Sequence, residues 1–189
     1  MTKYTKFEFI DCPSLEKPFS EDEKILWDAK PHKKAYLAHT VMSQIHFIAL
    51  WVFIEIILIF ACLYEAKSYP IMLIVMIPFF SFHLMPVWLW INNIKSKYND
   101  WLRTVYYITD KQIVIQSGIQ SLEYRTIQFE DILGVSINTS KYDHYFGVAD
   151  IIFDIKADDF LNVQRAFLDL TNANEAYTLL QSVLPNLQR

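Results

Sequence analysis

The sequence predicts a two-helix transmembrane hairpin joined to one cytoplasmic domain, a small antiparallel β sandwich or barrel capped by a C-terminal helix. Three observations support this fold class. Two long apolar stretches, Ile45–Leu63 and Tyr69–Ile91, each approach the roughly 20 residues that a helix needs to cross a bilayer. Beyond them, apolar residues alternate with polar ones, as in strands with one buried face. Near the end of the chain the apolar residues return to helical spacing.

The two apolar stretches are separated by a short polar hinge, Glu65–Ser68. A linker of this length allows only a tight turn, so the two helices are expected to lie antiparallel and side by side. Both ends of the chain would then share one compartment. The alternative is a pair of buried helices in a soluble protein, which the length of the stretches and their charged flanks disfavour.

Basic residues near the ends of the spans predict which compartment this is, because they are retained on the cytoplasmic side. The first two dozen residues contain no apolar segment before a cleavage site, so a secretory signal peptide is not expected. We therefore expect a multi-pass inner-membrane protein with both termini cytoplasmic. The basic residues flanking the hairpin are Lys30, Lys33, Lys34, Lys95, Lys97 and Arg103, against Lys67 alone in the hinge.

The domain organisation follows from these segments. We expect an N-terminal cytoplasmic segment over residues 1–36, the hairpin over 37–96 and the soluble domain over 97–189. Cys12 and Cys62 lie in different environments, so no disulfide framework is expected. Three glycines in the whole chain exclude glycine-rich phosphate-binding loops.

The soluble domain begins with short segments of alternating hydrophobicity, which predict strands separated by polar or glycine-containing turns. Such regular short strands are typical of a small sandwich or barrel. The expected strands are Thr104–Thr109, Gln112–Ser117, Leu122–Phe129, Leu133–Thr139, Ala149–Ile155 and Val163–Leu170.

Helical patterns flank this strand region. Asn172, followed three residues later by Glu175, resembles an N-cap, and an apolar stripe follows it before Pro185 ends the helix. Asn92–Arg103 has apolar residues at helical spacing and is expected to continue the second span as an interfacial helix. The leader, residues 1–20, is expected to be a mobile tail or an added sheet edge. The closing stripe is Ala176, Tyr177, Leu180, Val183 and Leu184.

The chain contains four short motifs in the order in which a known family carries them, and it thereby resembles that family, the bacterial membrane-anchored pleckstrin-homology-like (PH-like) proteins of the YdbS type. The resemblance implies a membrane-anchored cytoplasmic PH-like domain without an established catalytic activity. Lys111-Gln112 stands where the family usually carries arginine, and Ala149 replaces a common glycine. The motifs are Glu23–Trp27 with Pro31, Tyr107–Val114 with Gly118, Glu130–Ile132 and Tyr145–Ile151.

The charge of the soluble domain disfavours two classes of ligand. From Thr104 onward the chain holds six lysines and arginines against eleven acidic residues. A phosphoinositide site needs converging basic side chains, and no such specific site is evident. Nucleic acid is disfavoured by the same sign of charge.

Glu55 lies about midway along the first span, where an ionisable side chain costs on the order of 2.5–3.5 kcal/mol by insertion scales. Counting from the hinge places it level with Pro78, whose ring frees a carbonyl at about Ile74. His83 lies about a turn nearer the cytoplasm, and His46 lies close to the cytoplasmic end. Two interpretations stay open: a proton or ion relay, and a protonated carboxyl that only locks helix packing.

No catalytic, cofactor or metal site is expected from the remaining polar residues. Asp150 and Asp154 have strand spacing, and Asp158 with Asp159 lies in a turn without the residues of an EF-hand loop. Asp143-His144 provides too few ligands for zinc and has no adjacent nucleophile.

These observations favour binding or assembly over chemistry. The expected partners are the lipid bilayer and either further copies of the chain or another membrane protein. The expected contact surface is an uncovered sheet edge or the exposed aromatics Tyr142, Tyr145 and Phe146. The alternative function is a subunit of a proton-coupled transporter or small channel that uses Glu55 and His83.

Overall fold

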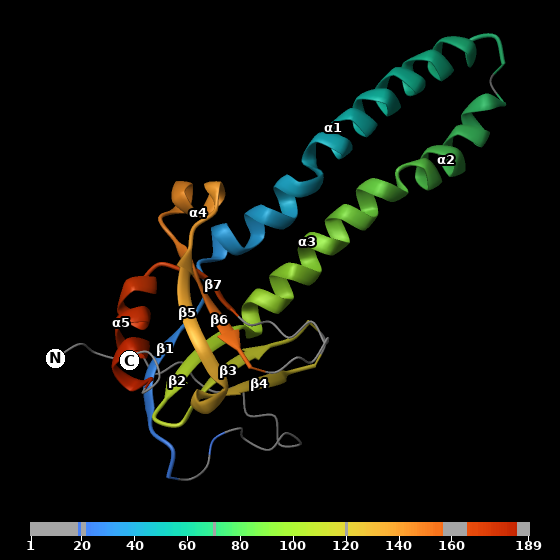
Figure 1. Ribbon diagram of the computed structural model, residues 1–189. Coiled ribbons are helices and arrows are strands. Elements are labelled where there is room, and N and C mark those ends of the chain that lie inside the picture. The colour runs from blue at the N-terminus through green and yellow to red at the C-terminus, as the bar shows by residue number, and fades with distance from the viewer. Residues whose placement is uncertain (1–18, 20–21, 70, 120, 157–165, 185–189) are drawn as a thin grey trace. The chain divides into compact units, whose positions relative to one another are not determined.

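In the computed structural model the chain forms two compact units (Figure 1). We call Met1–Tyr36 with Asn99–Arg189 the lobe, and Leu37–Tyr98 the helical unit. The structure describes residues 19, 22–69, 71–119, 121–156 and 166–184. The expectations for the leader, for the start of the last strand and for Asp158 with Asp159 fall largely outside these residues.

The helical unit contains a long first helix, α1 (Lys33–Glu65), that runs beside two shorter ones, α2 (Met72–His83) and α3 (Met85–Arg103) (Figure 1). The predicted hinge is a turn, in which the N–H groups of Ser68 and Tyr69 both donate to the Glu65 carbonyl. By length and composition α1 could cross a membrane by itself. α2 and α3 meet the same criterion only if they are counted together as one span bent by 41°.

The second apolar stretch is thus not one helix, and Pro86 explains where it breaks. The break is at Leu84, two residues before Pro86, whose nitrogen has no hydrogen to donate to the preceding turn. Val87 donates its N–H to the Leu84 carbonyl instead, which begins the new helix. Pro78 lies inside α2, without a break in the helix there. The predicted interfacial helix is the C-terminal part of α3.

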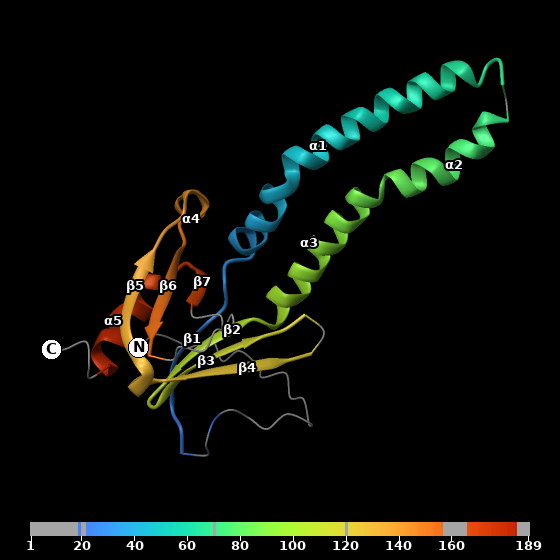
Figure 2. The same ribbon diagram turned by 45° about the vertical axis from the view of Figure 1, so that its right-hand side comes forward.

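The lobe contains two antiparallel sheets (Figure 2). The strand order in the first sheet is β1-β2-β3-β4, and in the second it is β5-β6-β7. The predicted strands lie within one or two residues of those observed wherever the described residues allow a comparison. The strands are β1 (Ile25–Ala29), β2 (Val105–Thr109), β3 (Gln112–Ser117), β4 (Glu123–Gln128), β5 (Ile132–Asn138), β6 (Ala149–Ile155) and β7 (Ala166–Leu170).

Two main elements of the lobe were not predicted. β1 pairs with β2 although the helical unit separates them in the sequence, with Trp27 opposite Ile108 and Ala29 opposite Tyr106. The helix α4 (Lys141–Phe146) stands at the end of the β5–β6 hairpin, where only a turn was expected (Figure 1). A single 3₁₀ turn, Phe129–Asp131, separates β4 from β5.

The core of the lobe lies between the two sheets and the last helix, α5 (Ala173–Val183). Tyr106, Phe153 and Phe167 are fully buried there, and the rings of Tyr106 and Phe153 each contact that of Phe167. Ala176 and Leu180 of the predicted apolar stripe reach the same core. Asn172 is the N-cap residue of α5, as predicted, but its side chain makes no hydrogen bond to the helix backbone, and its amide instead donates to Glu175 Oε2 at 3.5 Å.

Candidate functional site

The helical unit holds one buried carboxyl group, and the structure gives it a partner. Glu55 of α1 is 2% exposed. Its Oε1 is in direct polar contact with Nδ1 of His83, the last residue of α2. This contact needs one proton between the two atoms, carried by the imidazole or by the carboxyl group. Phe79 stacks on the other side of the cluster, with its ring centroid 5.2 Å from that of His83.

Trp51 belongs to the same cluster, and it also donates a hydrogen bond to a backbone carbonyl at the helix break. Its ring centroid lies 5.1 Å from that of His83, and its Nε1 donates to the His83 carbonyl at 3.0 Å. Because Val87 donates to Leu84, this carbonyl has lost its usual helical donor. Trp51 therefore provides a hydrogen bond that the break removes, as neighbouring helices do in membrane proteins.

Two details differ from the predicted arrangement. Spacing from the hinge placed Glu55 near the Ile74 carbonyl, whereas its contact is with His83, and among the described residues its Oε2 has no hydrogen-bond partner. His46 is exposed on α1, nine residues before Glu55 and so about 13 Å away along the axis. The structure brings Glu55 and His83 together, and it leaves His46 outside their cluster.

In the lobe, the predicted aromatic surface lies on α4, a short helix with both ends fixed. Ser140 and Asp143 form a reciprocal capping box at its start, which explains why Asp143 is buried. Gly147 ends the helix with φ 66°, a left-handed conformation that glycine adopts without strain. The residues that were expected to form a turn thus form a helix with a cap at each end.

The aromatic side chains of α4 differ in exposure. Tyr145 is 83% exposed and Tyr142 is 47% exposed. Phe146 lies half-buried, with Tyr145 packed edge-on against it and the His32 ring 6.1 Å from its own. We call Tyr142, Tyr145 and Phe146 the α4 surface.

Three carboxylates lie close together at α4 and the strands beside it. One oxygen from each of Asp143, Asp150 and Asp169 lies within 4.8 Å of the others. Asp143 serves as the helix cap, and Asp150 Oδ1 accepts the Asp169 N–H at 2.8 Å. Burial raises the pKa of Asp150, with a smaller opposing effect of this hydrogen bond. The structure thus gives Asp143 and Asp150 internal roles.

The first turn of α1 and the last turn of α3 belong to the lobe, and side chains there join the two turns. The Tyr36 hydroxyl donates to Asp100, and Trp101 Nε1 donates to the Pro31 carbonyl. Lys30 and Lys33, which were assigned to membrane topology, both lie over the Trp101 ring, at 4.4 and 5.3 Å from its centroid. These lysines therefore also contribute to structure.

Comparison with known proteins identifies one family. A family model described as bacterial PH domain matches residues 37–184 of the chain. No curated protein and no solved structure matches it.

Proposed function

This chain belongs to the bacterial PH domain family, and from this premise we propose that it is a membrane-anchored interaction module. It oligomerises or docks another membrane protein through its lobe, and it catalyses no reaction. The helical unit is its anchor, a two-span hairpin in the inner membrane with both termini cytoplasmic.

The exposure of the α4 surface is the observation that carries the binding role. A helix of six residues is too short to be stable by itself, and its capping box and glycine C-cap fix its two ends. Its largest side chain points to solvent, since Tyr145 is 83% exposed. Exposed tyrosines on a rigid support are typical of binding hot spots, because they bury much area at little entropic cost.

Affinity purification of the full-length chain in mild detergent, with measurement of the complex mass, tests this proposal. The wild type is expected to elute in a complex of defined mass, and Tyr145→Asp is expected to reduce the bound partner at least tenfold. Ile119→Asp is the matched control, because Ile119 is also an exposed apolar residue of the lobe, 48% exposed. A purely monomeric wild type, or equal retention in both variants, contradicts the binding role.

The proposed anchor makes a separate prediction about topology. In a chain whose two native cysteines are replaced by serine, a cysteine introduced at Ser68 should react with an impermeant maleimide added outside the inner membrane. A cysteine introduced at Tyr145 should react only after the membrane is permeabilised. Labelling of both sites from the same side contradicts the hairpin.

The contact between Glu55 and His83 favours a second candidate function, a proton-coupled transporter subunit or small channel. Two helices cannot enclose a pore, so this function also requires an oligomer. It predicts pH-gradient-driven flux in reconstituted liposomes that Glu55→Gln abolishes. Absence of flux, or flux unchanged in that variant, leaves the pair with a packing role alone.

A further inference from the structure

The strand β5 is an open edge of the second sheet, and nothing else in the described chain pairs with its outer side (Figure 2). Its backbone bonds run to β6 on one side only. An open edge presents a row of unpaired N–H and C=O groups, which is a template for another strand.

Proteins usually protect such edges with charged side chains, and β5 lacks this protection. Its sequence, Ile-Leu-Gly-Val-Ser-Ile-Asn, carries no charge. Each of the other edge strands does: β1 has Asp28, β4 has Glu123 and Arg125, and β7 has Asp169. Two apolar side chains of β5 are also exposed, Leu133 at 53% and Ile137 at 37%.

Gly134 in β5 lies beside an irregularity, because the register of β5 against β6 shifts between Ile132 and Gly134. It does not have the left-handed backbone of the other two glycines, Gly118 with φ 140° and Gly147 with φ 66°. A Cβ there would meet nothing nearer than Asp154 Cβ at 3.8 Å. Glycine within a strand often marks such a bulge, and it also leaves room for another backbone to approach closely.

We propose that β5 pairs antiparallel with β5 of a second copy of this chain, joining the two second sheets into one continuous sheet. This inference deepens the proposed function and rests on it, because it names the oligomeric contact of the interaction module. The pairing gives hydrogen bonds to the open edge, covers Leu133 and Ile137, and uses the close approach that Gly134 allows.

A second copy fits this edge because an uncharged strand meets no like charge when it pairs with itself. β4 would bring Glu123 and Arg125 into any such pairing, which would then depend on their register. Copies anchored in one membrane also meet at a high local concentration, so a short strand contact is enough to hold them. A two-fold axis makes the contact isologous and closes the assembly at two copies.

The test uses the full-length chain in lipid nanodiscs or mild detergent, with its mass measured by light scattering. The wild type should be a dimer. Gly134→Thr and Ser136→Lys should each raise the dimer dissociation constant at least tenfold, because the first adds a branched side chain where the backbones approach and the second places like charges together. Both changes are compatible with the monomer fold, since Ser136 is exposed and a Cβ at Gly134 would make only an ordinary contact with Asp154 Cβ at 3.8 Å.

Thr126→Lys is the matched control, an exposed residue of the other long edge strand, β4. It should leave the dimer unchanged. As direct evidence, single cysteines introduced in turn at Leu133, Gly134, Val135 and Ser136, in a chain with serine at both native cysteine positions, should form a disulfide between copies at the position nearest the two-fold axis, and one at Thr126 should not. An unchanged mass in both β5 variants, or equal disruption by Thr126→Lys, overturns the pairing.

The melting temperature of each variant distinguishes lost pairing from lost folding. Ser136→Lys decides the matter if Gly134→Thr fails to fold. A monomeric wild type that still binds a partner through the α4 surface overturns this inference and leaves the proposed function standing. A β5-linked dimer whose partner binding is unaffected by Tyr145→Asp supports the pairing and contradicts the role of α4.

Discussion

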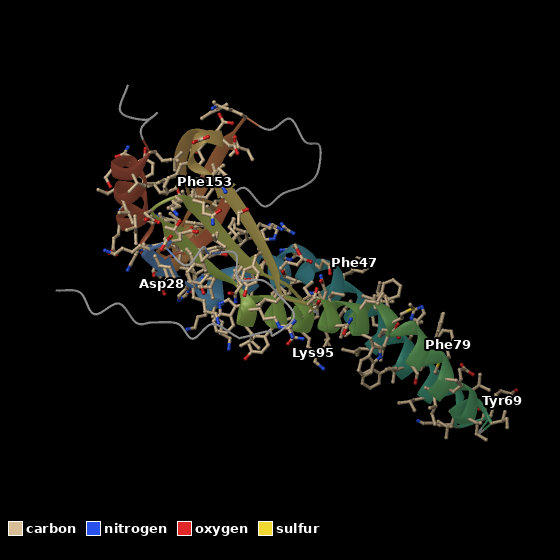
Figure 3. The ribbon with its side chains drawn as sticks, turned by 90° about the horizontal axis from the view of Figure 1, so that it is seen from below. Asp28, Phe47, Tyr69, Phe79, Lys95 and Phe153 are labelled. Atoms are coloured by element: carbon tan, nitrogen blue, oxygen red, sulfur yellow. The ribbon has the colours of Figure 1, made fainter. Side chains whose placement is uncertain are left out.

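The helical unit and the lobe distribute their side chains in opposite ways. On the helical unit, large apolar residues face outward, among them Phe47, which Figure 3 labels, at 55% exposure, and Phe60 at 70%. Its most buried large side chain is an acid, Glu55. In the lobe the aromatic residues Tyr106 and Phe153 are buried, and the exposed residues of its strands are mostly polar or charged.

The proposed membrane anchor explains this difference, because one physical rule then applies in two solvents. In water, folding removes apolar surface, so the apolar residues gather inside. In lipid, apolar surface gains nothing from burial, and polar groups are the ones that must find partners inside the protein. The contact of Glu55 with His83 and the bond from Trp51 to the His83 carbonyl are what the proposed anchor would require in lipid.

The largest effect is expected from truncating the same residue type in the two regions. Phe153→Ala, in the core of the lobe, should lower the free energy of unfolding by about 3–5 kcal/mol because it removes apolar contacts and leaves a cavity. Phe60→Ala, on the outer face of α1, should change it by less than about 0.5 kcal/mol. Denaturant unfolding of the full chain in mild detergent measures both. Similar losses in the two variants would mean that the outer face of α1 is covered by protein.

A charge on the outer face of the helical unit sharpens the comparison. Phe53 is 60% exposed and lies near the middle of the apolar part of α1. Phe53→Lys should oppose membrane insertion by about 2.5–3.5 kcal/mol, with Phe53→Leu as the control. The inserted fraction after alkaline extraction measures this cost. Equal insertion of the two variants would indicate that lipid does not cover this face.

Two glycines test the lobe itself. Gly147→Ala should destabilise it by about 1–2 kcal/mol, because a side chain opposes the left-handed backbone there. Gly134→Ala should stabilise the single lobe by about 0.4–1 kcal/mol, since its backbone suits any residue. Thermal unfolding at a concentration where the chain is monomeric measures both. Destabilisation by Gly134→Ala would reveal an internal role for that glycine.

The smallest effect is a pH dependence in the lobe. Burial raises the pKa of Asp150 above its usual value, so its contribution to stability is full below about pH 4 and is lost as the pH rises through the folded-state pKa. Asp150→Asn keeps an acceptor for the Asp169 N–H and should be more stable at pH 7 by less than about 1 kcal/mol, since the site is partly solvated. The advantage should vanish toward pH 4.

Melting curves between pH 4 and 8 measure this difference, with Asp154→Asn as the control because Asp154 is exposed on the same strand. If Asp150→Asn is less stable than the wild type at pH 7, the charged carboxylate of Asp150 stabilises the lobe.

The strands of the lobe were largely predictable because alternation is a local signal with a two-residue period. β1 was not, since its five residues pair with β2 across the entire helical unit and only that pairing makes Ile25–Ala29 a strand. α4 was missed because its capping box is a short signal within six helical residues, below the length at which helical periodicity can be recognised.

The sequence predicted which residues belong to the candidate site, but it did not predict which residues they contact. A carboxyl within an apolar helix is visible in any sequence, so Glu55 was expected to need a partner. Which residue it meets depends on how α1 and the broken second stretch face each other, and uniformly apolar stretches hide that face. In the structure the more buried positions of this part of α1 repeat every three or four residues: Ile48, Val52, Glu55, Ile59 and Cys62.

The sequence by itself determined which segments avoid water and which alternate, because hydrophobicity and local period are properties of neighbouring residues. The tertiary structure alone decided the contact of Glu55 with His83, the pairing of β1 with β2 and the open edge of β5. These depend on which distant backbones meet. The free energy of the whole chain decides which backbones meet, and no local segment determines this by itself.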